Sequence, residues 1–134
     1  MDELIKEGAV FRLKASGIKN HYHIVANVDA QTGSFLLLGV ITSHVEMRKR
    51  DALESGESLR TIVDITPEQC PCLKYNSAID CNSPYVIKRD VLNACIDRGS
   101  AIFECVVSPE ITSKIRNGVL LSKSAEMSAK GLSR

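Results

Sequence analysis

The sequence predicts an α+β domain built around a small antiparallel β-barrel, with two helices in its C-terminal part. Short strand-like segments separated by turns fill most of the chain, and two segments with a single apolar stripe come late. Strands and helices do not alternate regularly, so a parallel sheet is not indicated. At 134 residues the chain has the size of one ordinary domain. We expect a single domain over residues 1–122 and a polar, frayed tail over residues 123–134.

The first part of the chain predicts three strands bounded by turn residues. They cover residues 9–13, 21–28 and 35–43. The second strand alternates, so that His21, His23 and Asn27 point to one face while mostly apolar residues point to the other. The turn residues that follow it predict a hairpin with the third strand, which is mostly apolar.

The rest of the chain predicts a long loop, further short strands and two helices. The polar segment Glu46–Ser58 has few apolar residues, and we interpret it as a loop that can hold helical turns. The further strands cover residues 61–65, 77–81, 85–88 and 101–107. The first helix runs from about Lys88 to Gly99, with Val91, Leu92, Cys95 and Ile96 at helical spacing. The second begins with Ser108-Pro109, carries the stripe Ile111, Ile115, Val119, and ends near Leu121.

Composition predicts a cytoplasmic protein with no membrane segment. The apolar runs are too short to span a bilayer, and the N-terminus lacks the basic start and apolar run of a signal peptide. Five cysteines without the spacing of a secreted disulfide framework are expected to be reduced. The net charge of +1 neither favours nor excludes a polyanionic partner.

The order of the segments resembles the MazF/PemK family of bacterial toxins over about residues 7–122. The matching stretches are Glu7–Phe11, His21–Val25, Val40–Ser43, Ser77–Cys81 and Ile87–Leu92. The resemblance implies an SH3-like barrel, cleavage of single-stranded RNA without a metal or cofactor, a homodimer and an antitoxin partner. The family's catalytic arginine falls at His21, the proline after it falls at Tyr22, and the loop before them is shortened to about residues 14–20.

His21 supplies a different chemistry from the family's arginine. Histidine can give or take a proton near neutral pH, whereas arginine mainly donates to phosphate. Because His21 and His23 are two residues apart on a strand, they project from one face about 7 Å apart and could bracket one phosphate. We therefore expect His21 to act as general acid/base with help from His23, while Thr42 and Ser43 donate hydrogen bonds to the oxyanion. The alternative is that both histidines are exposed strand residues on a polar face.

RNA binding is expected from residues near these positions. Lys14, Lys19 and Arg48 could hold phosphates, and Tyr22 or Tyr75 could stack on one base. A non-catalytic module for protein or nucleic-acid interaction on the same barrel is the alternative function. His21-x-His23 with Cys70-x-Cys72 and Cys81 offers enough zinc-ligand types, but the spacing is tighter than usual, so no metal site is predicted.

Overall fold

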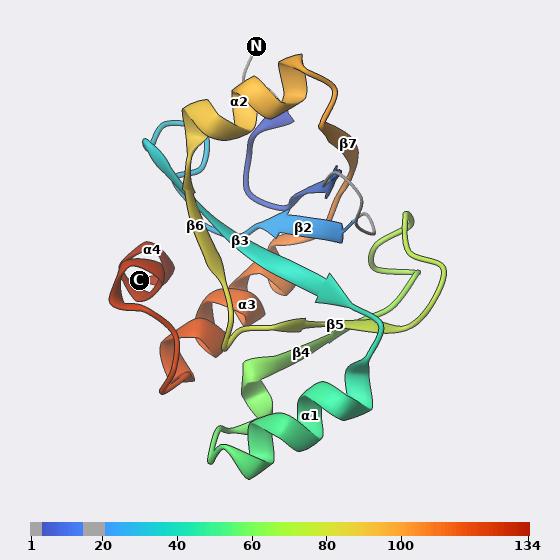
Figure 1. Cartoon of the computed structure of the whole chain (residues 1–134), viewed down its shortest axis with the longest axis vertical. Helices are drawn as coiled ribbons and strands as arrows, with labels where there is room; N and C mark the ends of the chain where they lie inside the picture. Colours follow the sequence, from blue (N-terminus) through green and yellow to red (C-terminus); the bar gives the residue numbers. More distant parts are fainter. Residues whose placement is uncertain (1–3, 15–20) are drawn as a thin grey trace.

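The described part of the chain folds into a seven-stranded antiparallel sheet with four α-helices (Figure 1). The computed structural model describes residues 4–14 and 21–134. The strands are β1 (Ala9–Leu13), β2 (His21–Val25), β3 (Phe35–Thr42), β4 (Ile62–Ile65), β5 (Ser77–Asp80), β6 (Tyr85–Lys88) and β7 (Ala101–Val106). The helices are α1 (Val45–Glu54), α2 (Arg89–Asp97), α3 (Pro109–Leu121) and α4 (Met127–Ser133), and a 3₁₀ turn covers Leu59–Thr61.

β3 is the strand that joins the two parts of the sheet. The strand order is β4-β5-β3-β2-β1-β7, and β6 also pairs with β3. One edge of β3 pairs with β2, while its other edge pairs first with β6 and then with β5. Among the described strands β4 and β7 end the order and do not pair with each other, so the sheet is open and the predicted barrel is not confirmed.

Both faces of the sheet are buried, which explains why the third strand is apolar throughout instead of alternating. One face packs against α3 and the other against α2. The α3 side includes Val10, Ile24, Leu37, Ile79, Ile111 and Ile115. The α2 side includes Phe11, Val25, Leu36, Leu38, Leu92 and Ala101. Neighbouring residues of one strand therefore enter different cores, as the two-residue period of a strand requires.

α3 lies in close contact with the sheet and with the end of β5. Its stripe Ile111, Ile115 and Val119 is at most 1% exposed, as its helical spacing predicts. A Cβ atom placed on Gly39 of β3 would lie 2.7 Å from Cγ2 of Ile79. One placed on Gly118 of α3 would lie 2.7 Å from Sγ of Cys81, so glycine is needed for this approach.

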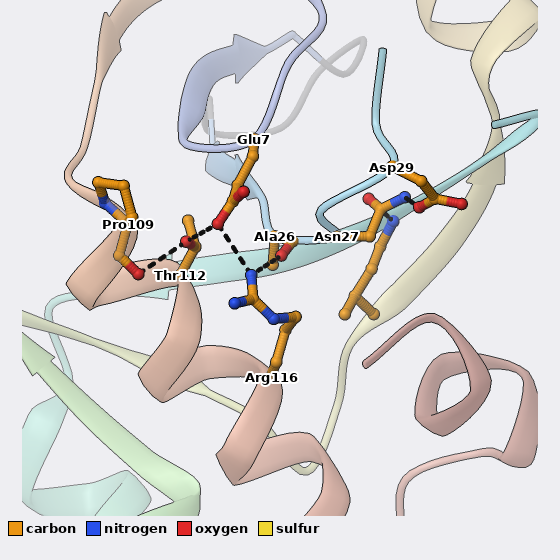
Figure 2. A network of polar contacts seen from close by, with 8 residues as sticks. Glu7, Ala26, Asn27, Asp29, Pro109, Thr112 and Arg116 are labelled. Atoms are coloured by element: carbon orange, nitrogen blue, oxygen red, sulfur yellow. Dashed lines mark hydrogen bonds and ion pairs between the residues drawn. The ribbon is translucent and has the colours of Figure 1, made fainter. Parts of the chain in front are cut away.

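A polar network fixes α3 to the chain segments beside it (Figure 2). Nη1 of Arg116 donates to Oε2 of Glu7 at 2.9 Å and to the carbonyl of Ala26 at 2.8 Å. The hydroxyl of Thr112 also donates to Glu7. Burial raises the pKa of Glu7, but the hydrogen bonds from Thr112 and Arg116 outweigh it and leave the pKa below its ordinary value.

Two predictions for the polar segments are wrong. The segment expected to be a loop contains the ten-residue helix α1, of which only Ala52 is buried. The tail expected to fray forms α4, in which Ala129 and Ser133 are buried. The Glu57 carboxylate links the two regions, because it accepts hydrogen bonds from the backbone N–H groups of Lys123 and Ser124 at 2.9 and 3.1 Å.

The remaining elements follow the sequence closely. Each predicted strand is present, although β2 ends at Val25 because Asn27 turns inward. Its side chain is fully buried and accepts from Leu37 N–H while donating to the carbonyl of Phe35 (Figure 2 labels Asn27). Both late helices are present, although Val91 is 50% exposed rather than buried. Within residues 4–14 and 21–134, the helices are too short and too polar to traverse a lipid bilayer.

Candidate active site

A pocket of about 360 Å³ opens where the start of β2, the end of β3, the start of α1 and the β4–β5 loop meet. Its described lining is His21, Tyr22, Val40, Ile41, Thr42, Ser43, His44, Arg48, Cys72, Leu73, Lys74, Tyr75 and Ser77. Two imidazoles, a guanidinium and an ammonium group are present in this lining, and no Asp or Glu is present among its described residues. The composition favours an anionic ligand.

The pocket brings together three of the four predicted catalytic residues. His21 is exposed at the first position of β2, and Thr42 and Ser43 follow at the end of β3. The backbone N–H of His44 donates to Oγ1 of Thr42 at 3.1 Å, which leaves the hydroxyl proton of Thr42 available for another acceptor. The predicted grouping of a histidine with two hydroxyls is therefore present.

His23 does not share this pocket, and its predicted pairing with His21 around one phosphate is not supported. Its side chain is only 9% exposed, and its ring lies 6.0 Å from the ring of Tyr85. Burial lowers the pKa of His23 below its ordinary value, so the ring is neutral at neutral pH. The interpretation of both histidines as exposed residues on a polar face is equally wrong for His23, because that face of the sheet carries the α2 core.

Arg48 is held at the pocket by α1. Its Nη1 atom lies 3.5 Å from Oδ2 of Asp80, and its Nε atom is buried without a hydrogen-bond partner among the described residues. A donor that is left unpaired in this way is costly to bury unless a ligand accepts its hydrogen bond. Arg48 thus presents an unpaired donor at the pocket, and its role in RNA binding stays a prediction.

The other predicted RNA-binding residues differ in position. Tyr22 lines the pocket, and burial raises its pKa above the ordinary value. Lys14 is exposed after β1 and is not part of the pocket lining. Lys19 lies outside the described residues.

His44 is a candidate site residue that the sequence interpretation did not single out. It directly follows Thr42-Ser43 and stands at the N-cap of α1, where it makes no side-chain capping bond. The sequence does show an imidazole directly after the two hydroxyls. It was not considered because the segment that follows, Glu46–Ser58, was interpreted as a loop. Lys74 was not singled out as a binding residue because only the fold brings the β4–β5 loop to the pocket. Tyr75, which the sequence offers beside Tyr22 for stacking on a base, lies on the same loop and lines the pocket.

Three cysteines meet beside the pocket, in a combination different from the one weighed for zinc. The Sγ–Sγ distances are 3.5 Å for Cys70–Cys72, 3.6 Å for Cys70–Cys105 and 3.7 Å for Cys72–Cys105. Cys81 is instead buried beneath α3, near Gly118. Burial, together with the neighbouring thiol of Cys105, raises the pKa of Cys72 to about 11, although the hydrogen bond with Cys70 acts in the opposite direction.

Comparison with solved structures finds proteins of similar fold. No protein-family model matches the chain, and no curated protein sequence matches it significantly. One similar solved structure is described as an endoribonuclease in complex with its cognate antitoxin from mycobacterial species. It has a TM-score of 0.54 and 12% sequence identity, and the alignment covers 95% of each chain. The match confirms the resemblance to MazF/PemK-like toxins at the level of the fold: this chain has the fold of an endoribonuclease that was solved with its antitoxin.

Proposed function

We propose that this protein is the endoribonuclease toxin of a toxin–antitoxin pair and that it cuts single-stranded RNA in the cytoplasm without a metal ion in the reaction. The observation that carries the proposal is the pocket, whose described lining joins two imidazoles, two cationic side chains and several hydroxyls without a carboxylate. The shared fold with an antitoxin-bound endoribonuclease supports it. The strand order, in which one edge of β3 pairs with both β6 and β5, is compatible with an SH3-like barrel that is open between β4 and β7.

The phosphate would bind between α1 and the β4–β5 loop. Arg48 offers its buried, unpaired Nε–H, and Lys74 adds a positive charge from the opposite loop. Ser43 and His44 place the phosphate near the first backbone N–H groups of α1, which carry the positive end of the helix dipole. These donors would stabilise the extra negative charge of the phosphorane.

Two imidazoles would transfer the protons. His21 approaches the pocket from the start of β2, and His44 approaches it from the N-cap of α1. One neutral imidazole removes the proton of the 2′-hydroxyl, whose oxygen attacks the adjacent phosphorus. One protonated imidazole gives a proton to the leaving 5′-oxygen. We assign these roles to His21 and His44 as a pair, and the hydroxyls of Thr42 and Ser43 would donate to the non-bridging oxygens.

The same pocket would bind both an RNA base and a segment of the antitoxin. Tyr22 and the 70% exposed Tyr75 offer aromatic faces for a base beside the phosphate. An antitoxin segment would inhibit the enzyme by occupying this pocket, and an acidic segment would suit its charge. A homodimer is expected by resemblance to the toxin family.

The test is cleavage of mixed-sequence single-stranded RNA by the full-length protein in EDTA. We expect products with a 2′,3′-cyclic phosphate and a 5′-hydroxyl. His21→Ala should slow cleavage by about 100-fold or more, because it removes a proton-transfer group. The control is His23→Phe, which removes an imidazole outside the pocket and should leave the rate within a few-fold of the parent.

Each alternative has its own outcome. RNA binding without any cleavage by the wild-type protein would support the non-catalytic module and contradict the enzyme. Cleavage that is equally fast in His21→Ala would remove His21 from the mechanism. Cleavage that stops in EDTA and is restored by magnesium would contradict the metal-independent reaction.

A further inference from the structure

Cys70, Cys72 and Cys105 form a compact triangle of sulfur atoms. All three Sγ–Sγ separations lie between 3.5 and 3.7 Å. In a tetrahedral zinc site with Zn–S bonds of about 2.3 Å, two sulfurs are about 3.8 Å apart. The triangle therefore needs to expand by only a few tenths of an ångström to hold an ion that lies about 1 Å above its plane.

The chain positions these sulfurs from two distant segments. Cys70 and Cys72 lie on the β4–β5 loop, where Cys70 N–H donates to the carbonyl of Thr66 at 3.0 Å and Leu73 N–H donates to the carbonyl of Cys70 at 3.0 Å. Cys105 lies on β7, opposite Val10 and beside the register shift between β1 and β7. Backbone hydrogen bonds thus fix the loop and the strand independently of any ion, so the ligands are pre-organised.

We propose that Cys70, Cys72 and Cys105 bind one thiophilic divalent cation of the zinc class. Three thiolates select a soft or borderline metal over magnesium and calcium, which prefer oxygen. Within the described residues no fourth His, Cys, Asp or Glu joins the triangle, so water would complete the coordination. Binding converts three thiols into thiolates and releases their protons to solvent, with no change of oxidation state.

The site would tie the pocket wall to the sheet. Cys72 itself lines the pocket, and Leu73, Lys74 and Tyr75 follow it along the same wall. An ion shared with Cys105 would anchor this loop to β7. The role is structural and stands apart from the proposed cleavage reaction, because none of the proposed proton-transfer groups is a ligand.

Metal binding can be measured on the reduced full-length protein without RNA. Zinc titrated against a chromophoric chelator should bind with 1:1 stoichiometry. Cys72→Ser and Cys105→Ser should each weaken the affinity by about 100-fold or more, since each removes one of three ligands. Cys95→Ser is the matched control, because Cys95 lies on α2 outside the triangle, and this variant should bind zinc like the parent.

Cobalt(II) gives a second measurement that needs only the wild-type chain. Thiolate ligation should produce intense near-ultraviolet charge-transfer absorption, and binding should slow amide hydrogen exchange at Lys74 and Tyr75. Failure of the reduced wild-type protein to bind zinc, or equal loss in Cys95→Ser and Cys105→Ser, would overturn the proposal. The proposal would also be overturned if the isolated protein contained a disulfide between these cysteines and its reduction did not restore zinc uptake. These experiments do not measure RNA cleavage, so their results do not depend on whether the protein is an endoribonuclease.

Discussion

The network around α3 and the pocket at the start of α1 use polar side chains in opposite ways. In the network, the carboxylate of Glu7 is paired by Arg116 and Thr112, and Arg116 also satisfies the carbonyl of Ala26 (Figure 2). In the pocket, Nε of Arg48 lacks a partner among the described residues and the side chain of His44 does not cap its helix. Paired polar groups stabilise the fold, whereas unpaired groups are available to a ligand.

The largest effect on stability is expected from the network. Arg116→Leu leaves Glu7 without its ionic partner and the carbonyl of Ala26 without its donor. With the two side chains 16% and 25% exposed, we expect a loss of about 2–4 kcal/mol in the free energy of unfolding. Urea denaturation measures it. Lys114→Leu, an exposed change on the same helix, should stay within about 0.5 kcal/mol.

A smaller, pH-dependent effect is expected at Glu57. Backbone hydrogen bonds from Lys123 and Ser124 hold its pKa below the ordinary value of 4.5. Because the folded pKa is lowered, this stabilisation is present above pH 4.5 and is lost as the pH falls through the lowered value. Glu57→Gln should cost about 1–2 kcal/mol at neutral pH and should remove this part of the acid dependence.

Urea denaturation at several pH values checks the prediction for Glu57. The matched control is Glu54→Gln, since Glu54 is exposed at the end of α1. Equal acid dependence in the parent and in Glu57→Gln would show that Glu57 does not contribute to it.

The smallest effect on stability is expected in the pocket. His44→Ala removes a side chain that makes no capping bond, so the free energy of unfolding should change by less than about 0.5 kcal/mol. RNA cleavage should nevertheless fall by about 100-fold or more, because a proton-transfer group is lost. A large loss of stability would mean that His44 also stabilises the fold. It would contradict the distinction between the pocket and the polar network around α3.

The sequence was informative wherever apolar spacing decides the structure. Ile111, Ile115 and Val119 predict both the helix and its buried side. α1 has no such stripe, since Ala52 is its only buried residue, and its helix was therefore not predicted. α4 was missed for a similar reason, because it buries the small side chains of Ala129 and Ser133.

The site was predicted only in part, because the spacing of residues along a strand does not show which distant segments of the chain lie beside it. Alternation placed His21 and His23 on one side of a strand, but the burial of His23 depends on Tyr85 from β6. Likewise, Cys70 and Cys72 are close in the sequence, whereas Cys105, which contacts them, comes 35 residues after Cys70. Local spacing cannot reveal contacts that only the order of the strands creates.

Gly39 of β3 and Gly118 of α3 lie at positions where the sequence of this protein cannot easily change. An alanine at Gly39 or Gly118 adds one methyl group, yet that carbon would need space already taken by Ile79 or Cys81. At Gly118 of α3 the helix would have to move away from Cys81, and at Gly39 the side chain of Ile79 on β5 would have to shift beneath the helix. Relatives of this chain that keep the same helix-to-sheet distance should therefore be recognisable by glycine at these two positions, even where the pocket has changed its chemistry.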